Sequence, residues 1–174
     1  MKGVHSRPSI RRLTSDEWRE YRALRLRALA DSPSAFSTTL AEAQARDDSA
    51  WSRQVARGAE SSAEIALVAE SEARWVGLAW CGIDAEDRHR AWLAQMWVDP
   101  SFRSVGTGRQ LLDAAIRWAA QLDARVMVLS VTCDNTAATR LYASAGFRPV
   151  GAPEPLRPGS NLLAQPMRLD LRGA

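Results

Sequence analysis

The chain has 174 residues, of which 46% are hydrophobic and 25% are charged, the composition of an ordinary globular protein that buries a sizeable core. The formal net charge of +3 comes from scattered arginines rather than a basic cluster, which disfavours a nucleic-acid-binding surface. The two cysteines and two histidines lack the spacing of a disulfide scaffold or a zinc site, and no apolar run approaches the roughly 18 residues that span a membrane.

These features together predict one domain over residues 1–174. Residues 1–10 are polar and lack the apolar segment of a signal peptide. We therefore expect a cytoplasmic protein that works without a metal ion, a nucleic-acid partner or a membrane.

The beginning of the chain predicts a short strand followed by two helices. The strand covers residues 10–13. Thr14 and Glu17 have capping-box spacing, and the apolar residues that follow recur at steps of three and four, which predicts a first helix. These apolar residues are Trp18, Tyr21, Leu24 and Ala28. After a break at residues 31–34, a second helix is expected over residues 40–56.

The hydrophobic period then changes to that of β-strands. Residues 65–69 and 74–83 are two apolar runs separated by a short turn, which predicts an antiparallel hairpin. A charged loop over residues 84–90 leads into a further strand over residues 91–98. The hairpin and this strand form the middle of the expected sheet.

The second half of the chain alternates helices and strands. Helices are expected over residues 108–122 and 135–145, and final strands over residues 147–150 and 162–169. Between the two helices, residues 126–131 form an apolar run typical of a parallel strand covered on both faces. A strand, helix and strand in succession give parallel strands with a right-handed crossover, so the sequence predicts an α/β fold with a mixed sheet.

A glycine turn between strand and helix is the most informative segment. It reads RSVGTGR at residues 103–109. Glycine lets a ligand approach the backbone closely, and the unpaired first amides of a helix, together with the helix dipole, attract an anion. Arg103 and Arg109 add positive charge. The segment therefore predicts a pyrophosphate site.

Three glycine motifs compete for this segment. A P-loop requires a lysine after the second glycine, Gly108, and none is present. The dinucleotide fingerprint requires a third glycine where Leu111 stands. The pattern R-x-x-G-x-G is matched in full by Arg103, Gly106 and Gly108. A plain strand-to-helix turn also fits the two glycines when they are considered alone.

A second motif, NTAATRLYASAGF at residues 135–147, contains the pattern N-x-x-A-x-x-L-Y-x-x-x-G-F. Its marked residues are Asn135, Ala138, Leu141, Tyr142, Gly146 and Phe147. The two motifs, in this order and about one βαβ unit apart, resemble those of the GNAT superfamily of N-acetyltransferases. The resemblance is strong over residues 91–150. One departure is Ser104, where many members have glycine.

The resemblance implies a GNAT fold with a mixed sheet of about six to seven strands and helices on both faces. It implies that the parallel fourth and fifth strands splay apart beyond Val98 and Val131. Residues 1–90 would form the acceptor side, residues 91–150 the acetyl-CoA-binding core, and residues 151–174 a C-terminal loop and strand. Acetyl-CoA is the expected cosubstrate, and the chain is expected to be a monomer or a homodimer.

The resemblance also implies the site residues. The expected cofactor-binding residues are Met96, Trp97, Val98, Arg103, Ser104, Val105, Gly106, Thr107, Gly108, Arg109, Asn135 and Tyr142. A backbone amide near Trp97 or Val98 would stabilise the oxyanion, and Tyr142 would protonate the departing thiolate. Asn135 would lie near the thioester as the second catalytic residue. Each also has a purely structural interpretation, Asn135 as a helix N-cap and Tyr142 as a core aromatic.

The sequence does not identify the residue that acts as general base. Some family members have a carboxylate on the fourth strand, but residues 91–98 contain none. Gln95 cannot accept a proton, although it can orient a water molecule. The candidate carboxylates are Glu42, Asp84, Glu86 and Asp87. Each is equally an ordinary solvated charge, and a chain of water molecules is a further alternative.

We therefore expect an acetyl-CoA-dependent N-acetyltransferase that modifies the primary amine of a small molecule by direct attack in a ternary complex. Acetylation of a protein N-terminus or lysine is an alternative within the same chemistry. A catalytically idle CoA-binding module is an alternative of another class. Fold and cofactor motif do not determine the acceptor.

Overall fold

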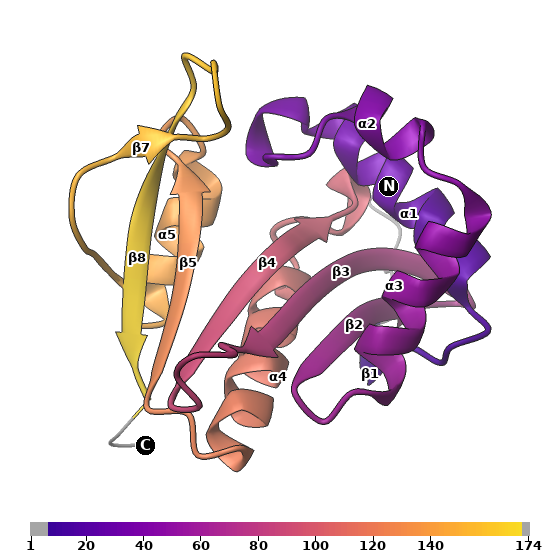
Figure 1. The fold of residues 1–174 in the computed structure, drawn as a ribbon, viewed down its shortest axis with the longest axis horizontal. Helices are drawn as coiled ribbons and strands as arrows, with labels where there is room; N and C mark the ends of the chain where they lie inside the picture. Colours follow the sequence, from indigo (N-terminus) through magenta and orange to yellow (C-terminus); the bar gives the residue numbers. More distant parts are fainter. Residues whose placement is uncertain (1–6, 172–174) are drawn as a thin grey trace.

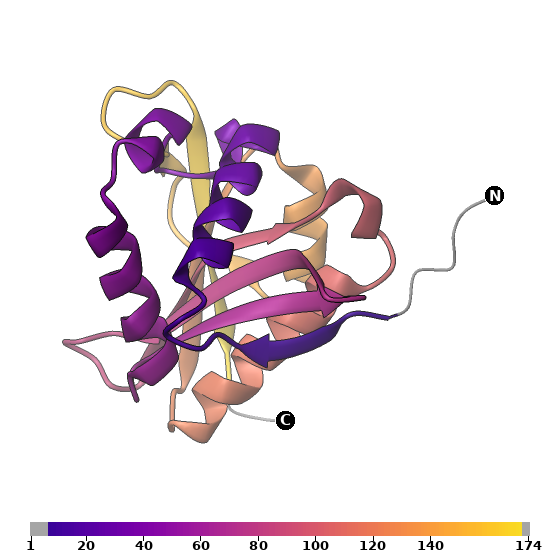
Figure 2. The same ribbon diagram turned by 90° about the vertical axis from the view of Figure 1, so that its right-hand side faces the viewer.

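The computed structural model describes residues 7–171 and shows a twisted sheet with helices on both faces (Figures 1 and 2). The strands are β1 (Ser9–Arg12), β2 (Glu64–Ser71), β3 (Arg74–Ile83), β4 (Arg90–Val98), β5 (Val126–Thr132), β6 (Arg148–Pro149), β7 (Glu154–Pro155) and β8 (Leu163–Asp170). The helices are α1 (Trp18–Asp31), α2 (Leu40–Gln44), α3 (Asp48–Glu60), α4 (Thr107–Gln121) and α5 (Thr136–Ser144). Two short 3-10 turns, η1 (Pro33–Ala35) and η2 (Pro100–Phe102), precede α2 and α4.

The strands follow the order β1-β2-β3-β4-β5-β8-β6, with β7 paired to β8. The pairs from β1 to β4 are antiparallel, β4 and β5 are parallel, and β8 lies antiparallel to β5. This arrangement confirms the predicted mixed sheet and its single βαβ crossover through α4. Figure 1 shows that β4 and β5 diverge from a common lower end, which confirms that the parallel strands splay.

The helices divide between the two faces of the sheet (Figure 2). Leu111, Leu112 and Ala115 of α4 pack on one face together with Tyr142 of α5. On the other face, side chains of α1 and α3 pack around Trp80 of β3, which is fully buried. Both faces of β2 and β3 are therefore buried, which explains their nearly unbroken apolar sequences.

Several boundaries differ from the sequence prediction. The expected helix over residues 40–56 is two helices, because Asp47 accepts a hydrogen bond from Ala50 N and starts α3 anew. At Thr14 only half of a capping box forms, since Glu17 accepts a hydrogen bond from Thr14 N at 2.9 Å and α1 begins four residues later. A complete capping box forms at Thr39 and Glu42 instead. Near the C-terminus, the expected strand over residues 147–150 is present as the two-residue β6, and the sheet gains a two-residue strand, β7, in a segment expected to be a loop.

Two expectations concern the termini and the membrane. Part of the polar segment 1–10 and the last residues of the expected C-terminal region lie outside the described residues. Among the helices within residues 7–171, none is long and apolar enough to cross a membrane.

Gly58 marks the closest approach of α3 to the sheet. A Cβ atom at this position would lie 2.7 Å from the Cβ of Ala66 and 2.7 Å from the ring of Trp80. Both neighbours are themselves buried, so neither has room to move. The helix therefore sits on the sheet at a distance that only glycine permits.

We expect Gly58→Ala to destabilise the protein by about 1–3 kcal/mol, since overpacking outweighs the gain of about 1 kcal/mol in helix propensity. Urea unfolding followed by circular dichroism measures the change. A variant that is more stable than the wild type would show that α3 can move away from β2 and β3 at little cost.

Candidate active site

The site is organised by the early separation of β4 from β5. Their parallel pairing extends only from Arg90 with Val126 to Trp92 with Val128. Beyond this point β5 continues its full pairing with β8 on its other side. The strands thus part well before Val98 and Val131, where the sequence analysis placed the separation.

A β-bulge in β4 lies just beyond the end of this pairing. Leu78 of β3 pairs with Trp97 while Trp80 pairs with Ala94, so two residues of β4, Gln95 and Met96, lie opposite one residue of β3. Gln95 has a left-handed φ of 54°. A bulge of this kind bends its strand, which turns the end of β4 away from β5.

Between the diverging strands lies a narrow crevice of about 60 Å³. Its walls combine residues from both faces of the sheet, Phe36 from the α1 side and Tyr142 from the α4 side. Met96, Val131 and Asn135 also line it. The crevice therefore connects the two faces at the one place where the sheet is open.

The glycine turn leads into α4 as predicted. Gly106 is the N-cap of α4 with a φ of 91°, and the first helical hydrogen bond runs from Gln110 N to Gly106 O. The amides of residues 107–109 consequently have no acceptor within the helix. Ser104 has a φ of 64°, a conformation that favours glycine, so the departure from the family pattern falls at a position where a side chain is strained.

The two glycines of the motif serve different physical purposes. At Gly106 the left-handed backbone itself favours glycine, and no atom lies within 4 Å of the Cβ that another residue would add. At Gly108 the added Cβ would point inward, 3.2 Å from Leu141 Cδ2 and 3.7 Å from Met96 Cε. Gly106 therefore keeps the approach to the turn open, whereas Gly108 lets α4 lie close to β4 and α5.

The two arginines of the motif already have carboxylate partners. Arg103 pairs with Asp31 and donates from Nε to Val98 O at 2.9 Å. Arg109 donates to Asp113 at 2.8 Å. Both side chains remain about half exposed. In this structure the backbone amides, rather than an unpaired arginine, form the anion-attracting surface of the turn.

Two carboxylates anchor the turn to the rest of the fold. Asp99 accepts from Ser101 N at 3.0 Å and pairs with Arg27 and Arg74. Burial raises the pKa of Asp99, but the hydrogen bonds from Ser101 and the two arginine charges outweigh it, so the pKa lies below its usual value. Asp31 likewise accepts a 2.9 Å hydrogen bond from Trp97 Nε1.

The last residues of β4 contribute side chains to both faces of the sheet. Met96 and Val98 contact the position of Gly108 beneath the start of α4. The Trp97 ring is buried on the opposite face, among the side chains of α1. The end of β4 therefore supports the glycine turn on one face while its tryptophan fixes α1 on the other.

Asn135 and Tyr142, the two residues singled out in the second motif, both line the crevice. Asn135 is the N-cap of α5 and accepts from Ala138 N at 3.1 Å. Tyr142 is 8% exposed and packs edge-on against Phe147, with 5.8 Å between the two ring centroids. Burial raises the pKa of Tyr142 to about 12, so its hydroxyl keeps its proton at neutral pH. Within residues 7–171 we find no hydrogen-bond partner for this hydroxyl.

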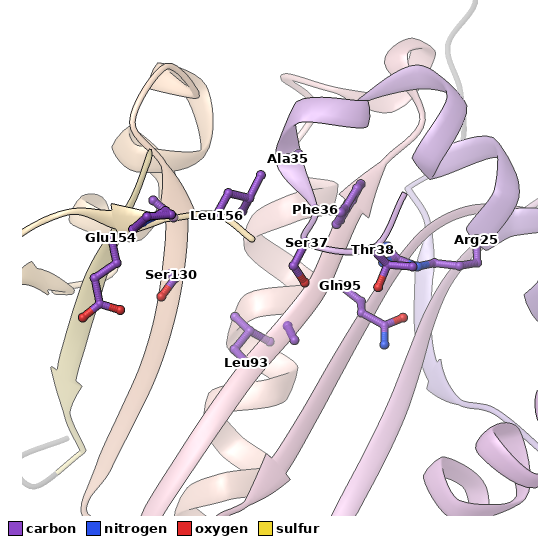
Figure 3. Close-up of a pocket in the computed structure, with 13 residues that line it drawn as sticks. Arg25, Ala35, Phe36, Ser37, Thr38, Leu93, Gln95, Ser130, Glu154 and Leu156 are labelled. Atoms are coloured by element: carbon purple, nitrogen blue, oxygen red, sulfur yellow. The ribbon is translucent and has the colours of Figure 1, made fainter. Parts of the chain in front are cut away.

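The crevice opens into a larger cleft of about 450 Å³ (Figure 3). The two cavities share six lining residues, namely Ala35, Phe36, Leu93, Ala94, Gln95 and Ser130. Two contacts hold the rim of the cleft together. Thr132 Oγ1 donates to Ser34 O at 2.8 Å, and Arg157 donates to Phe36 O at 3.0 Å.

The candidate bases from the sequence do not gather at this cleft. Asp84, Glu86 and Asp87 precede β4 and lie at the end of the strand opposite the bulge. Glu42 completes the capping box of α2 instead. Gln95 does line the cleft, where its side-chain oxygen accepts a hydrogen bond from Tyr21.

Sequence reasoning missed two charged residues that line the cleft, Arg25 and Glu154. Arg25 had a detectable signal, because it falls on the apolar face of the first helix, four residues after Tyr21 and three before Ala28. Glu154 had none, since it stands in an irregular segment and reaches the cleft only because β7 pairs with β8.

Comparison with known proteins places the chain among acetyltransferases. The model of the acetyltransferase (GNAT) family matches residues 11–147. A mycothiol acetyltransferase of Propionibacterium freudenreichii is 39% identical over 83 residues, which are 47% of this chain and 27% of that protein. Another, from Clavibacter sepedonicus, is 29% identical over 135 residues, 78% of this chain and 41% of that protein. The chain thus spans less than half the length of these curated relatives.

Solved structures agree in fold. A GNAT-family acetyltransferase from Streptococcus pneumoniae superposes with a TM-score of 0.80 at 22% identity, over 94% of this chain and 98% of that one. A putative acetyltransferase from Salmonella typhimurium, solved with acetyl-CoA, gives 0.78 at 22% identity, over 97% and 96% of the two chains. With the family model covering most of its length, the chain belongs to the acetyltransferase (GNAT) family.

Proposed function

We propose that this protein transfers the acetyl group of acetyl-CoA to the primary amine of a small molecule, by direct attack within a ternary complex. The observation that carries the proposal is the crevice between β4 and β5. On one face it adjoins the start of α4, and on the other it opens into the cleft beside α1 and η1. Donor and acceptor can therefore approach the same gap from opposite faces.

The residues around the crevice fit acetyl-CoA. The unpaired amides of residues 107–109 and the open space above Gly106 suit a pyrophosphate. A gap of about 60 Å³ between two strands admits a thin chain such as pantetheine but excludes a bulky group. The proposed cofactor-binding residues are those of the sequence prediction, with Met96 and Val98 acting chiefly as support for Gly108.

Two side chains are proposed to move protons. Tyr142 lines the crevice with a hydroxyl that stays neutral, so it can donate a proton to the sulfur that leaves. Glu154 is the one carboxylate among the residues that line the cleft, which makes it the proposed acceptor of the proton from the attacking ammonium. A backbone amide at Trp97 or Val98 is proposed to polarise the carbonyl, and Asn135 to position α5 beside it.

The size of the cleft and the segment at its rim favour a small acceptor over a protein. A volume of about 450 Å³ is typical of a small-molecule site. The segment around β7 borders the cleft and is fixed to η1 through Arg157, which narrows the path that a polypeptide acceptor would need. The relatives named mycothiol acetyltransferases agree with a small acceptor.

Gly106→Val should weaken the binding of CoA at least about tenfold, because a β-branched residue at a φ of 91° is strained and its side chain enters the space left open for the phosphates. Titration calorimetry measures the affinity. Gly151→Val is the matched control, since this glycine also has a positive φ, of 68°, and open space around its added Cβ, but it lies outside the turn. A folded Gly106→Val variant with wild-type affinity would place the phosphates elsewhere.

Tyr142→Phe should lower the single-turnover rate by about a hundredfold and leave the KM for acetyl-CoA nearly unchanged, because it deletes only the proton donor. Since the pKa of Tyr142 is raised to about 12, the wild-type rate should lose nothing to ionisation of this hydroxyl up to about pH 10. A Phe variant as fast as the wild type would mean that water protonates the sulfur.

Glu154→Gln should lower kcat/KM at pH 7 by about a hundredfold or more, because the amine arrives protonated and needs a base. The loss should shrink as the pH approaches about 10, where solvent deprotonates the amine. Glu42→Gln, at another exposed glutamate that only caps a helix, is the control. If the ratio of variant to wild-type kcat/KM stayed constant across this pH range, Glu154 would not be the group that accepts the proton.

A further inference from the structure

Arg25 is a buried cation without a carboxylate partner among residues 7–171. Its side chain projects from α1, and the residue as a whole is only 5% exposed to solvent. Its NH1 atom is buried and has no hydrogen-bond partner. Its guanidinium carbon lies over the ring of Phe36, 4.2 Å from the ring centroid.

The neighbouring arginines of the same helix show what is missing. Arg22 pairs with Asp48 at 3.0 Å, and Arg27 pairs with Asp99. Both of these paired arginines are more exposed than Arg25. The one arginine of the three that most needs a counter-charge is therefore the one that lacks it.

A buried guanidinium is unfavourable unless an anion or several acceptors neutralise it. Burial lowers the pKa of Arg25, but arginine is too basic to lose its proton at neutral pH. The aromatic ring of Phe36 offsets only part of the lost hydration. The charge thus remains, together with unfilled hydrogen-bonding capacity at NH1.

The guanidinium lies where a ligand can supply the missing partner. Arg25 lines the cleft together with Thr38 and Gln95, and Figure 3 shows it extending from α1 toward these two residues. On the other side of the cleft, Figure 3 shows Glu154 beside β5. Arg25 and Glu154 are the only charged side chains among the lining residues described. The cleft therefore has one positive and one negative wall.

We propose that the acceptor is a small amine that carries a carboxylate, such as an amino acid, and that Arg25 binds this carboxylate. The proposal rests on the proposed acetyl transfer and specifies its substrate class. A single arginine matches a monovalent carboxylate in charge and in its paired hydrogen bonds. A phosphate dianion would leave one charge unbalanced in a cleft whose other charged group is acidic. The amino group then faces the crevice, within reach of the wall that holds Glu154.

The test compares amino acids with their carboxamides, which differ only in the charge of the group that meets Arg25. The twenty standard amino acids and the matching amides are assayed by thiol release from acetyl-CoA. For the acids that react, we expect kcat/KM to exceed that of the amide about ten- to hundredfold. Arg25→Met should abolish this preference by raising the KM for the acid, with little effect on the amide.

Two further variants separate recognition from folding. Arg25→Lys keeps the charge but loses the planar fork, so an intermediate preference is expected. Arg19→Met removes an exposed arginine of the same helix and should leave the preference intact. Thermal melting should show Arg25→Met to be at least as stable as the wild type, since it removes an unpaired buried charge.

Binding without turnover makes the proposal independent of catalysis. Calorimetry measures the N-acetylated amino acids and their amides against the protein saturated with CoA. Carboxylate binding that Arg25→Met abolishes, without any thiol release, would sustain Arg25 as the anion site and refute the proposed reaction. The proposal would be overturned if the protein used or bound acids and amides equally. It would also be overturned if the preference survived in a folded Arg25→Met variant, or if neither series bound to the CoA complex.

Discussion

The short parallel pairing of β4 and β5 is the constraint on which the rest of this structure depends. A sheet in which these strands paired along their whole length would be closed, with α4 and α1 isolated on its two faces. Here the pairing ends at Trp92, and the bulge at Gln95 and Met96 bends β4 beyond that point. β8 supplies β5 with the hydrogen-bond partner that β4 does not. The sheet stays intact as a whole while it opens locally.

The opening requires rigid edges, and the fold provides them by different means on its two sides. On the β4 side, Asp31 and Asp99 fix the strand end and the glycine turn to α1 and β3 through hydrogen bonds and ion pairs. On the β5 side, Thr132 joins the strand to η1, and Asn135 starts α5. These polar contacts hold the crevice apart where side-chain packing alone would tend to close it.

Charge is distributed unevenly around this opening. Most arginines near the site are paired with carboxylates of the chain, so they act as structural braces. Arg25 is buried without such a pair, and its NH1 atom has no hydrogen-bond partner among residues 7–171. Buried polar groups without partners are rare in folded proteins, and each one needs a physical reason. A ligand in the cleft would supply the partner that Arg25 lacks, while Tyr142 lines the crevice from the other face of the sheet.

The sequence alone determined the order of the main elements, the family and the glycine turn, because each depends on local features. Residues 103–109 fix backbone angles and unpaired amides within one turn of the chain, and residues 135–147 place an N-cap and a tyrosine on one helix. Hydrophobic period identified β2, β3 and β5 for the same reason. The break between α2 and α3 was missed because the apolar pattern runs across the cap at Asp47.

Only the tertiary structure decided where the sheet opens and which charges face the acceptor. The bulge at Gln95 has no local signature, since it arises from the mismatch between β4 and the register of β3. Glu154 reaches the cleft through the pairing of β7 with β8, and Arg25 becomes a buried cation only when η1 folds Phe36 over it. Residues far apart in sequence create these features jointly, so no periodicity or short motif encodes them.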